Sequence, residues 1–173
     1  MKRALLLAIP LFAWTLSCAS AQNEKKDPPK LVISKEAELI IKLTNEARVR
    51  EKLNPLKPNA LLFKCAEDYT AVQAKLMKCG HFVDGKRPDL RVDATGYDFK
   101  TCGENVAEIP FNIKPPVAKG QLIPTVFTGW MNSPIHKAEI LRKEYEEIGI
   151  GMAQDKNGSW YFTQVFGAEQ KKQ

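Results

Sequence analysis

Hydrophobic residues recur at a helical period in two stretches of the first half of the chain. From residue 36 to 50 they are spaced three or four apart, while charged residues cover the opposite side. A second stripe with this spacing runs over residues 60–78, after Asn59 and before Gly80. Asparagine is common just before a helix, and glycine is common just after one. The pattern therefore predicts two amphipathic helices at these positions.

Two shorter helices are predicted later in the chain, over residues 125–131 and 135–142. Ser133 and Pro134 stand between them, and this pair is typical of a helix start, with serine as the N-cap and proline at the first helical position. Residues 81–103, in contrast, contain scattered glycines and a proline. That region is expected to be mainly loop, with room for a short strand.

The pattern changes in the last third, where apolar residues alternate with small or polar ones. Such alternation covers residues 148–153 and again residues 160–166, and Asn157-Gly158 lies between the two runs. Two alternating runs around an Asn-Gly turn predict a β-hairpin. Helices followed by a hairpin place the chain in the α+β class.

The first 21 residues differ in character from the rest. A positively charged start is followed by an apolar run over residues 4–16, which is too short to span a bilayer, and then by Ala-Ser-Ala at 19–21. This order is typical of a cleavable export signal, so residues 1–21 are predicted to be removed. Cys18 leaves one alternative, because a cysteine after the apolar run can accept a lipid and anchor the chain as a lipoprotein.

The remaining chain has the size of one domain. We expect a flexible leader over residues 22–35, one domain over 36–168 and a polar tail over 169–173. The chain carries 26 basic and 20 acidic residues, and they are scattered rather than gathered on a basic face with interleaved aromatics. The composition thus favours a secreted, extracytoplasmic protein that has no transmembrane segment and no nucleic-acid partner.

Export would leave three cysteines, Cys65, Cys79 and Cys102, in a compartment that permits disulfides. They include no Cys-x-x-Cys pair, so a structural zinc site of the usual kind is not expected. The odd number predicts at most one bridge and one free thiol.

Candidate chemistry depends on two histidines, His81 and His136, and on one acid. His136 falls in the first turn of a predicted helix, where the helix dipole disfavours the imidazolium form. Neutral imidazole is the form that binds metals or accepts a proton. Glu104, which stands between a glycine and Asn105, is the acid that could join them, although a turn or a cap explains a Gly-Glu-Asn sequence as well.

A series of short motifs occupies most of residues 36–167. In chain order they are Leu43-Thr44-Asn45-Glu46-Ala47-Arg48, His81, Arg91, Gly96-Tyr97, Gly103-Glu104-Asn105-Val106-Ala107, Trp130-x-x-Ser133-x-x-His136, Ile148-Gly149-Ile150-Gly151 and Tyr161-Phe162-Thr163-Gln164-Val165-Phe166-Gly167. This series resembles the CAP superfamily of cysteine-rich secretory, antigen 5 and pathogenesis-related 1 proteins, most of all its secreted bacterial SCP-like branch. The resemblance implies a three-layer α–β–α sandwich with a small antiparallel sheet.

The resemblance also implies a cleft with two histidines and two acids, in which some members bind a divalent metal. The matching residues here are His81, His136 and Glu104. Ser133 stands where animal and plant members carry the second acid, and serine ligates metal poorly; Glu139, on the same helix face as His136, could supply an acid instead. Two imidazoles with one carboxylate could still hold zinc or another divalent cation. The residues expected to support the cleft are Asn105, Trp130, Ser133 and Gln164.

A cleft shared by His81 and Glu104 has a consequence for the cysteines. Cys79 lies two residues before this histidine, and Cys102 lies two residues before this glutamate. The resemblance would thus bring the two sulfurs into bridging range, which requires Cα atoms within about 7 Å of each other. Cys79–Cys102 is therefore the candidate disulfide, with Cys65 left as a free thiol.

Three functions are compatible with these residues. The first is a secreted binding module whose cleft takes a peptide, a lipid, a protein or a metal, and the absence of a nucleophile elbow or metalloprotease motif favours it. The alternative is a metal-assisted hydrolase of peptides or esters, with zinc on His81 and His136 and with Glu104 as the catalytic general base. In the third, the polar cluster only ties loops together. The proline-rich segment 108–124 is expected to rim the cleft.

Overall fold

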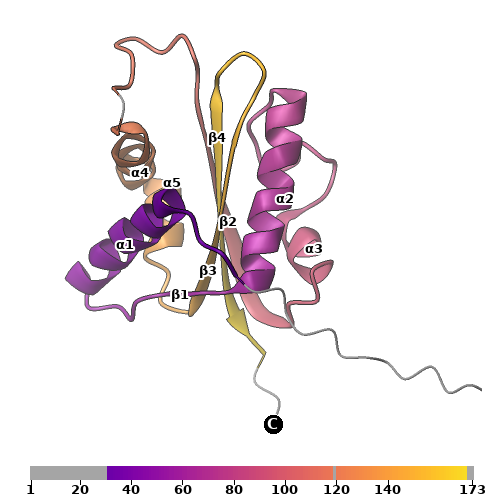
Figure 1. The fold of residues 1–173 in the computed structure, drawn as a ribbon. Coiled ribbons are helices and arrows are strands. Elements are labelled where there is room, and N and C mark those ends of the chain that lie inside the picture. The colour runs from indigo at the N-terminus through magenta and orange to yellow at the C-terminus, as the bar shows by residue number, and fades with distance from the viewer. Residues whose placement is uncertain (1–30, 119, 171–173) are drawn as a thin grey trace, which may run out of the picture.

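The computed structural model describes residues 31–118 and 120–170, and these form five helices and four strands. The predicted signal and residues 22–30 of the predicted leader lie outside this range. Figure 1 shows three layers, with α1, α4 and α5 on one face of the sheet and α2 and α3 on the other. The elements are α1 (Lys35–Arg50), β1 (Lys57–Pro58), α2 (Ala60–Leu76), α3 (Pro88–Asp93), β2 (Phe99–Ile109), α4 (Leu122–Asn132), α5 (Pro134–Ile140), β3 (Glu147–Gln154) and β4 (Trp160–Glu169).

The strand order in the sheet is β1-β3-β4-β2. The predicted hairpin is present, because β3 and β4 pair antiparallel from Glu147↔Gly167 to Gln154↔Trp160. β2 runs antiparallel to β4 and forms one edge of the sheet, while β1 adds a short parallel pairing at the other edge. The α+β class and the three-layer sandwich are thus confirmed. Among the described helices, none combines the length and the apolar character that a membrane crossing needs.

Two glycines of β3 allow helix α2 to lie directly on the sheet. A Cβ atom on Gly149 would lie 2.1 Å from the carbonyl carbon of Leu62, and one on Gly151 would lie 2.1 Å from the carbonyl oxygen of Ala66. No side chain fits at such distances from a helix backbone. The alternating glycines of the sequence are therefore the contact surface for α2, which carries the residues that flank the candidate site.

Residues 81–103 differ most from expectation. They contain the short helix α3 and the start of β2, which is 11 residues long and ends at Ile109. The hydrophobic pattern of the sequence did not reveal the full length of this strand, because two of its buried side chains, Glu104 and Asn105, are polar. A strand of this kind shows no alternation of apolar and polar residues. Its pairing with β4 identifies it instead.

The packed domain reaches beyond the boundaries predicted for it at both ends. Leu31 and Ile33, which the sequence placed in the leader, pack against the main hydrophobic core. At the other end Glu169 is the last residue of β4, and the N–H of Gln170 donates a hydrogen bond to the carbonyl oxygen of Asp98 at 2.8 Å. These residues are part of the folded unit.

A buried arginine ties α1 to the segment before β3. Arg48 is fully buried, and burial lowers its pKa from the ordinary value. Asn45, one turn earlier, exchanges two hydrogen bonds with the backbone of Leu56. The Asn-Glu-Ala-Arg motif is therefore structural, and it positions the chain that leads from α5 into β3. The guanidinium of Arg48 donates, at 2.8–3.1 Å, to the backbone carbonyl oxygens of Asn54, Ile140, Arg142 and Tyr145.

Candidate functional site

One candidate histidine and the candidate acid meet at the edge strand of the sheet. His81 follows the end of α2, and Glu104 lies in the middle of β2. The Nδ1 atom of His81 lies 2.9 Å from Oε1 of Glu104. The Glu104 side chain is only 2% exposed, whereas that of His81 is 39% exposed. The structure thus brings these two residues into contact, with the imidazole facing outward and the carboxylate behind it.

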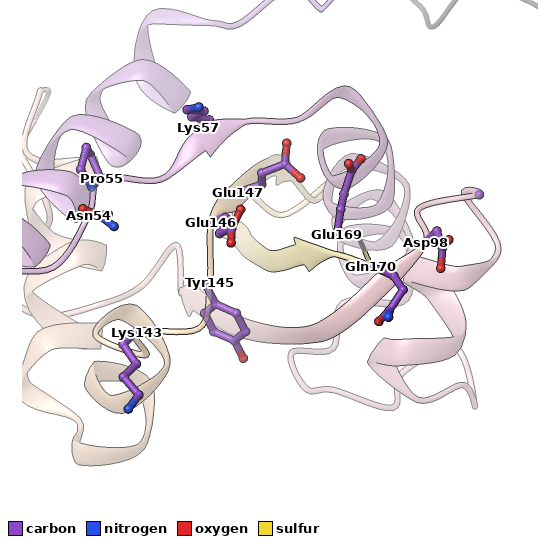
Figure 2. Close-up of a pocket in the computed structure, with 11 residues that line it drawn as sticks. Asn54, Pro55, Lys57, Asp98, Lys143, Tyr145, Glu146, Glu147, Glu169 and Gln170 are labelled. Atoms are coloured by element: carbon purple, nitrogen blue, oxygen red, sulfur yellow. The ribbon is translucent and has the colours of Figure 1, made fainter. Parts of the chain in front are cut away.

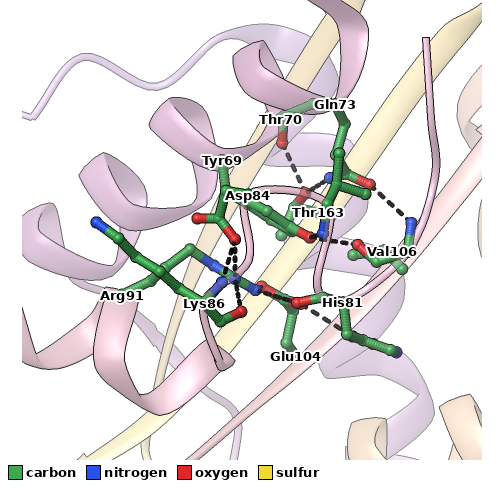
Figure 3. A network of polar contacts seen from close by, with 12 residues as sticks. Tyr69, Thr70, Gln73, His81, Asp84, Lys86, Arg91, Glu104, Val106 and Thr163 are labelled. Atoms are coloured by element: carbon green, nitrogen blue, oxygen red, sulfur yellow. Dashed lines mark hydrogen bonds and ion pairs between the residues drawn. The ribbon is translucent and has the colours of Figure 1, made fainter. Parts of the chain in front are cut away.

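The carboxylate of Glu104 is held from its other side by Arg91 of α3. One guanidinium nitrogen, Nη2, donates to Oε1 at 2.9 Å and to Oε2 at 2.8 Å. Arg91 also donates to Asp84 at 3.0 Å, and its guanidinium lies over the ring of Tyr69, 3.4 Å from the centroid. Figure 3 shows this network around the buried pair. Arg91 belonged to the motif series, but the sequence assigned it no role because its contacts depend on the fold.

This arrangement makes Glu104 an orienting residue for His81. Both carboxylate oxygens already accept hydrogen bonds from Arg91, and one of them also faces His81. A carboxylate beside Nδ1 favours the tautomer that carries the proton there and leaves Nε2 as an acceptor. The outward nitrogen of His81 is therefore the atom available to a ligand. Glu104 itself has no oxygen directed at open space for a metal or a water.

His136 approaches the same region from the opposite layer. It lies in the first turn of α5, and its backbone carbonyl oxygen accepts a hydrogen bond from Nδ2 of Asn105 at 3.0 Å. Burial lowers the pKa of the His136 imidazole, and the positive charge that His81 can carry lowers it further. The direction agrees with the neutral ring predicted from sequence. Glu104 and Asn105 are neighbours on β2, and their hydrogen bonds place His81 and the backbone of His136 at the same part of this strand.

The predicted support residues hold the α5 side of this site. Asn105 also donates to Oε1 of Gln164 at 3.2 Å, and Gln164 donates to Oγ1 of Thr44 at 3.0 Å. Trp130 donates its indole N–H to the carbonyl oxygen of Val106 at 3.2 Å, on β2. These bonds link α1, α4 and α5 to the two neighbouring strands. The position of His136 is thus tied to the sheet through its own backbone.

Neither Ser133 nor Glu139 supplies the second acid that the resemblance implies for the cleft. Ser133 is the residue before α5, as predicted, but its side chain makes no capping hydrogen bond. Glu139 accepts hydrogen bonds from the hydroxyl of Tyr145 at 2.5 Å and from Arg142 at 2.6 Å. It lies over Gly103, where any Cβ atom would be 2.3 Å from its Oε2. Its carboxylate is therefore used to fix α5 to β2 and β3.

The predicted Cys79–Cys102 disulfide is not formed. Both residues are free thiols, and so is Cys65. Cys102 packs against the hydrophobic cluster that contains Cys65, near one end of β2. Desolvation of its sulfur, together with the charges of Glu108 and Glu104 on β2, raises the pKa of Cys79 to about 11, although part of this side chain is exposed. The contact between His81 and Glu104 therefore did not bring the two sulfurs into a bond.

The residues present do not supply a complete metal site. Within residues 31–118 and 120–170, no group of three histidine, cysteine, aspartate or glutamate side chains is placed to hold a metal ion. The reason is visible in the geometry, because Arg91 and His81 occupy the carboxylate of Glu104. Two imidazoles remain, whereas protein zinc sites use three or four protein ligands. The expected role of Glu104 as a metal ligand or general base is therefore not supported.

A large hollow lies away from the histidines, at the end of the sheet that carries β1. Its volume is about 890 Å³. Figure 2 shows the acidic side chains that surround it. Glu147, the most enclosed of them, accepts hydrogen bonds from Tyr97 and Asn59. This hollow is therefore separate from the site that contains His81 and Glu104. The charged residues that line it are Lys57, Asp98, Lys143, Glu146, Glu147 and Glu169.

The fold and the site together define a class of small domain, an α–β–α sandwich with two histidines from opposite layers at one sheet edge. The family model CAP, described as the cysteine-rich secretory protein family, matches residues 41–166. The chain belongs to this family and is a CAP-domain protein of the extracellular type.

One known relative is similar in sequence over most of this chain. The uncharacterized protein YkwD of Bacillus subtilis (strain 168) is 29% identical over 155 residues, which are 86% of this chain and 53% of the relative. The chain spans about half the length of the relatives it matches.

Solved structures share the fold. An outer surface protein from Borrelia burgdorferi superimposes with a TM-score of 0.68 at 21% identity, over 81% of this chain and 97% of that one. NaASP2, solved with Zn2+, superimposes with a TM-score of 0.58 at 13% identity, over 82% of this chain and 84% of that one. At these identities the likeness concerns the fold alone.

Proposed function

We propose that this protein is an extracytoplasmic binding module whose ligand contacts the two imidazoles at the edge of β2. His81 and His136 come from opposite layers of the sandwich, and each is held by a separate hydrogen-bond network. Imidazole nitrogens can accept hydrogen bonds from a peptide or small ligand, or hold a divalent cation weakly. The ligand itself would then supply the remaining contacts.

The observation that supports this proposal best is the engagement of Glu104. Its carboxylate is 2% exposed and is bound by Arg91 through both oxygens. A residue in this state orients an imidazole well, but it is poorly placed to accept a proton from water. The site therefore has the character of a binding surface in which the charged pair stays behind the contact atoms.

A metal-assisted hydrolase is the second candidate. The structure of NaASP2 with Zn2+ supports it, because that protein shares the fold. In this chain, however, the hydrolase would need a third ligand and a base other than Glu104. We therefore place it behind the binding module.

Zinc is a convenient probe of the histidine pair. Calorimetric titration of Zn2+ into a chain that starts at residue 22, which contains every described element, should show weak binding at one site. His81→Ala and His136→Ala should each reduce the affinity at least about tenfold. Ser133→Ala is the matched control, since it changes a neighbouring side chain without removing an imidazole, and it should bind as the parent does.

Two results would count against the proposal. Equal zinc affinity and equal melting temperature in the parent and both histidine variants would show that the imidazoles do not form a site. Zinc-dependent cleavage of a peptide or ester library that is lost in both histidine variants would favour the hydrolase instead.

A further inference from the structure

Three segments meet at the end of the sandwich that carries the β3–β4 turn. They are the last turn of α2, the turn itself and the loop after β2, which Figure 1 shows projecting at the same end of the molecule. Nδ2 of Asn157 donates to Sδ of Met77 at 3.2 Å. A Cβ atom on Gly158 would lie 2.8 Å from the ring of Phe111. We call this continuous region, residues 75–78, 110–118 and 154–158, the turn-end surface.

The most exposed side chains of the turn-end surface include large apolar ones. Phe111 is 74% exposed, Leu76 is 45% exposed and Met77 is 41% exposed. Phe111 also borders an apolar hollow of about 430 Å³, which the loop after β2 forms with the hairpin and Trp160. Grouped large apolar side chains on a surface indicate an interaction site.

Lysines accompany these apolar side chains. Within the described residues, none of the four has a carboxylate oxygen within 4.0 Å of its ammonium nitrogen. Lys75 and Lys156 line a second hollow, which shares Gln154 with the apolar one, so the lysines and the apolar residues belong to one surface. The one acid within the turn-end surface, Asp155, accepts hydrogen bonds from the backbone of the turn. The four exposed lysines are Lys75, Lys78, Lys114 and Lys156.

The opposite end of the molecule has the reverse charge. Four carboxylates and two lysines surround the large hollow of Figure 2. The two ends of the strands therefore differ in charge, with a basic and apolar surface at one end and an acidic hollow at the other. An anionic surface would attract the first end and repel the second, which fixes the orientation of the whole domain.

We propose that the turn-end surface docks on an anionic lipid bilayer. Phe111 and Met77 enter the interfacial region, and the lysines face the lipid headgroups. Exposed apolar side chains on projecting loops, with lysines around them, match the two attractions that hold proteins at such an interface. The charge complementarity favours a bilayer over an uncharged partner. The histidine site plays no part in this contact.

Vesicle flotation tests the proposal. The chain from residue 22 onward should bind phosphatidylcholine vesicles that contain about 30% phosphatidylglycerol at low salt, and binding should weaken as salt is added. Phe111→Ser should lower the partition coefficient at least about tenfold, and the pair Lys78→Gln with Lys114→Gln should lower it about 30-fold. Two matched controls should bind as the parent does. They are Ile135→Ser, at a site 77% exposed on α5, and the pair Lys57→Gln with Lys143→Gln at the acidic end.

Each other outcome overturns the proposal. Absence of binding to the anionic vesicles, or equal binding to pure phosphatidylcholine, would remove the electrostatic basis. Equal losses in the control variants would show that the surface is not specific. A dimer in solution that becomes a monomer on Phe111→Ser, without vesicle binding by either, would assign the surface to contact between two copies of the chain. Melting temperatures of all variants would separate these effects from unfolding.

Discussion

Replacing Glu104 by glutamine should destabilise the domain by about 3 kcal/mol. The change keeps the shape of the side chain and removes the negative charge that faces Arg91. Both side chains are buried, with 7% of Arg91 and 2% of Glu104 exposed. Removing one partner of a buried ion pair costs about 3–5 kcal/mol, because the other charge stays behind without compensation. The lower end applies here, since Arg91 keeps its bond to Asp84 at 3.0 Å.

Urea unfolding followed by circular dichroism measures this loss directly. An exposed ion pair of the same kind provides the control, since Arg87 and Asp89 are 2.5 Å apart with side chains 69% and 31% exposed. Asp89→Asn should cost far less than Glu104→Gln, because solvent screens that pair. A loss for Glu104→Gln as small as that for Asp89→Asn would refute the assignment of Glu104 to the buried pair.

A double-mutant cycle isolates the interaction itself. Arg91→Met alone should also destabilise the domain, since it leaves the carboxylate of Glu104 without its main donor. The double variant should lose less than the sum of the two single changes, with a coupling of about 2 kcal/mol. Additive losses would mean that the two residues act independently, and the orienting role proposed for Glu104 would then lose its physical basis.

Three further expectations follow from the buried groups. Arg48→Met should cost more than about 3 kcal/mol in urea unfolding, because four carbonyl oxygens lose their donor. In denaturant without reductant, Cys65, Cys79 and Cys102 should all be alkylated, and mass spectrometry would reveal a bridged pair by its missing labels. In the folded protein, exposed Cys79 should react before Cys65, because burial raises the pKa of Cys65 to about 12. The pKa of His136 is lowered in the folded state, so the unfolded chain binds a proton at this residue more readily than the folded one. The melting temperature should therefore decrease as the pH falls below about 6.5, and this decrease should be smaller in His136→Gln.

Local patterns in the sequence were sufficient for much of the architecture. The helical stripe over 36–50 corresponds to α1, the stripe over 60–78 to α2, and the alternating runs around Asn157-Gly158 to the β3–β4 hairpin. These signals are strong because each element has one face in water and one in the core. The order of the motifs then identified the family, which the family model confirms.

The site depended on contacts between residues distant in sequence. His81, Arg91 and Glu104 come from three different segments, and only pairing of β2 with β4 and packing of α3 bring them together. The sequence named the histidine and the acid, yet it assigned the acid to metal or proton chemistry. It could not show that a guanidinium from α3 takes both oxygens, because such a contact has no periodic signature.

The cysteines show the same limit. Their number and the predicted export made a disulfide admissible, and equal spacing from His81 and Glu104 suggested which pair would form it. Bond formation, however, requires the two sulfurs to meet at bonding distance, and in the folded domain both Cys79 and Cys102 remain free thiols. The sequence by itself determined the elements, the class and the family, because these follow from short-range patterns and motif order. Only the tertiary structure decided which charges and thiols meet, because those distances are set by how strands and helices pack.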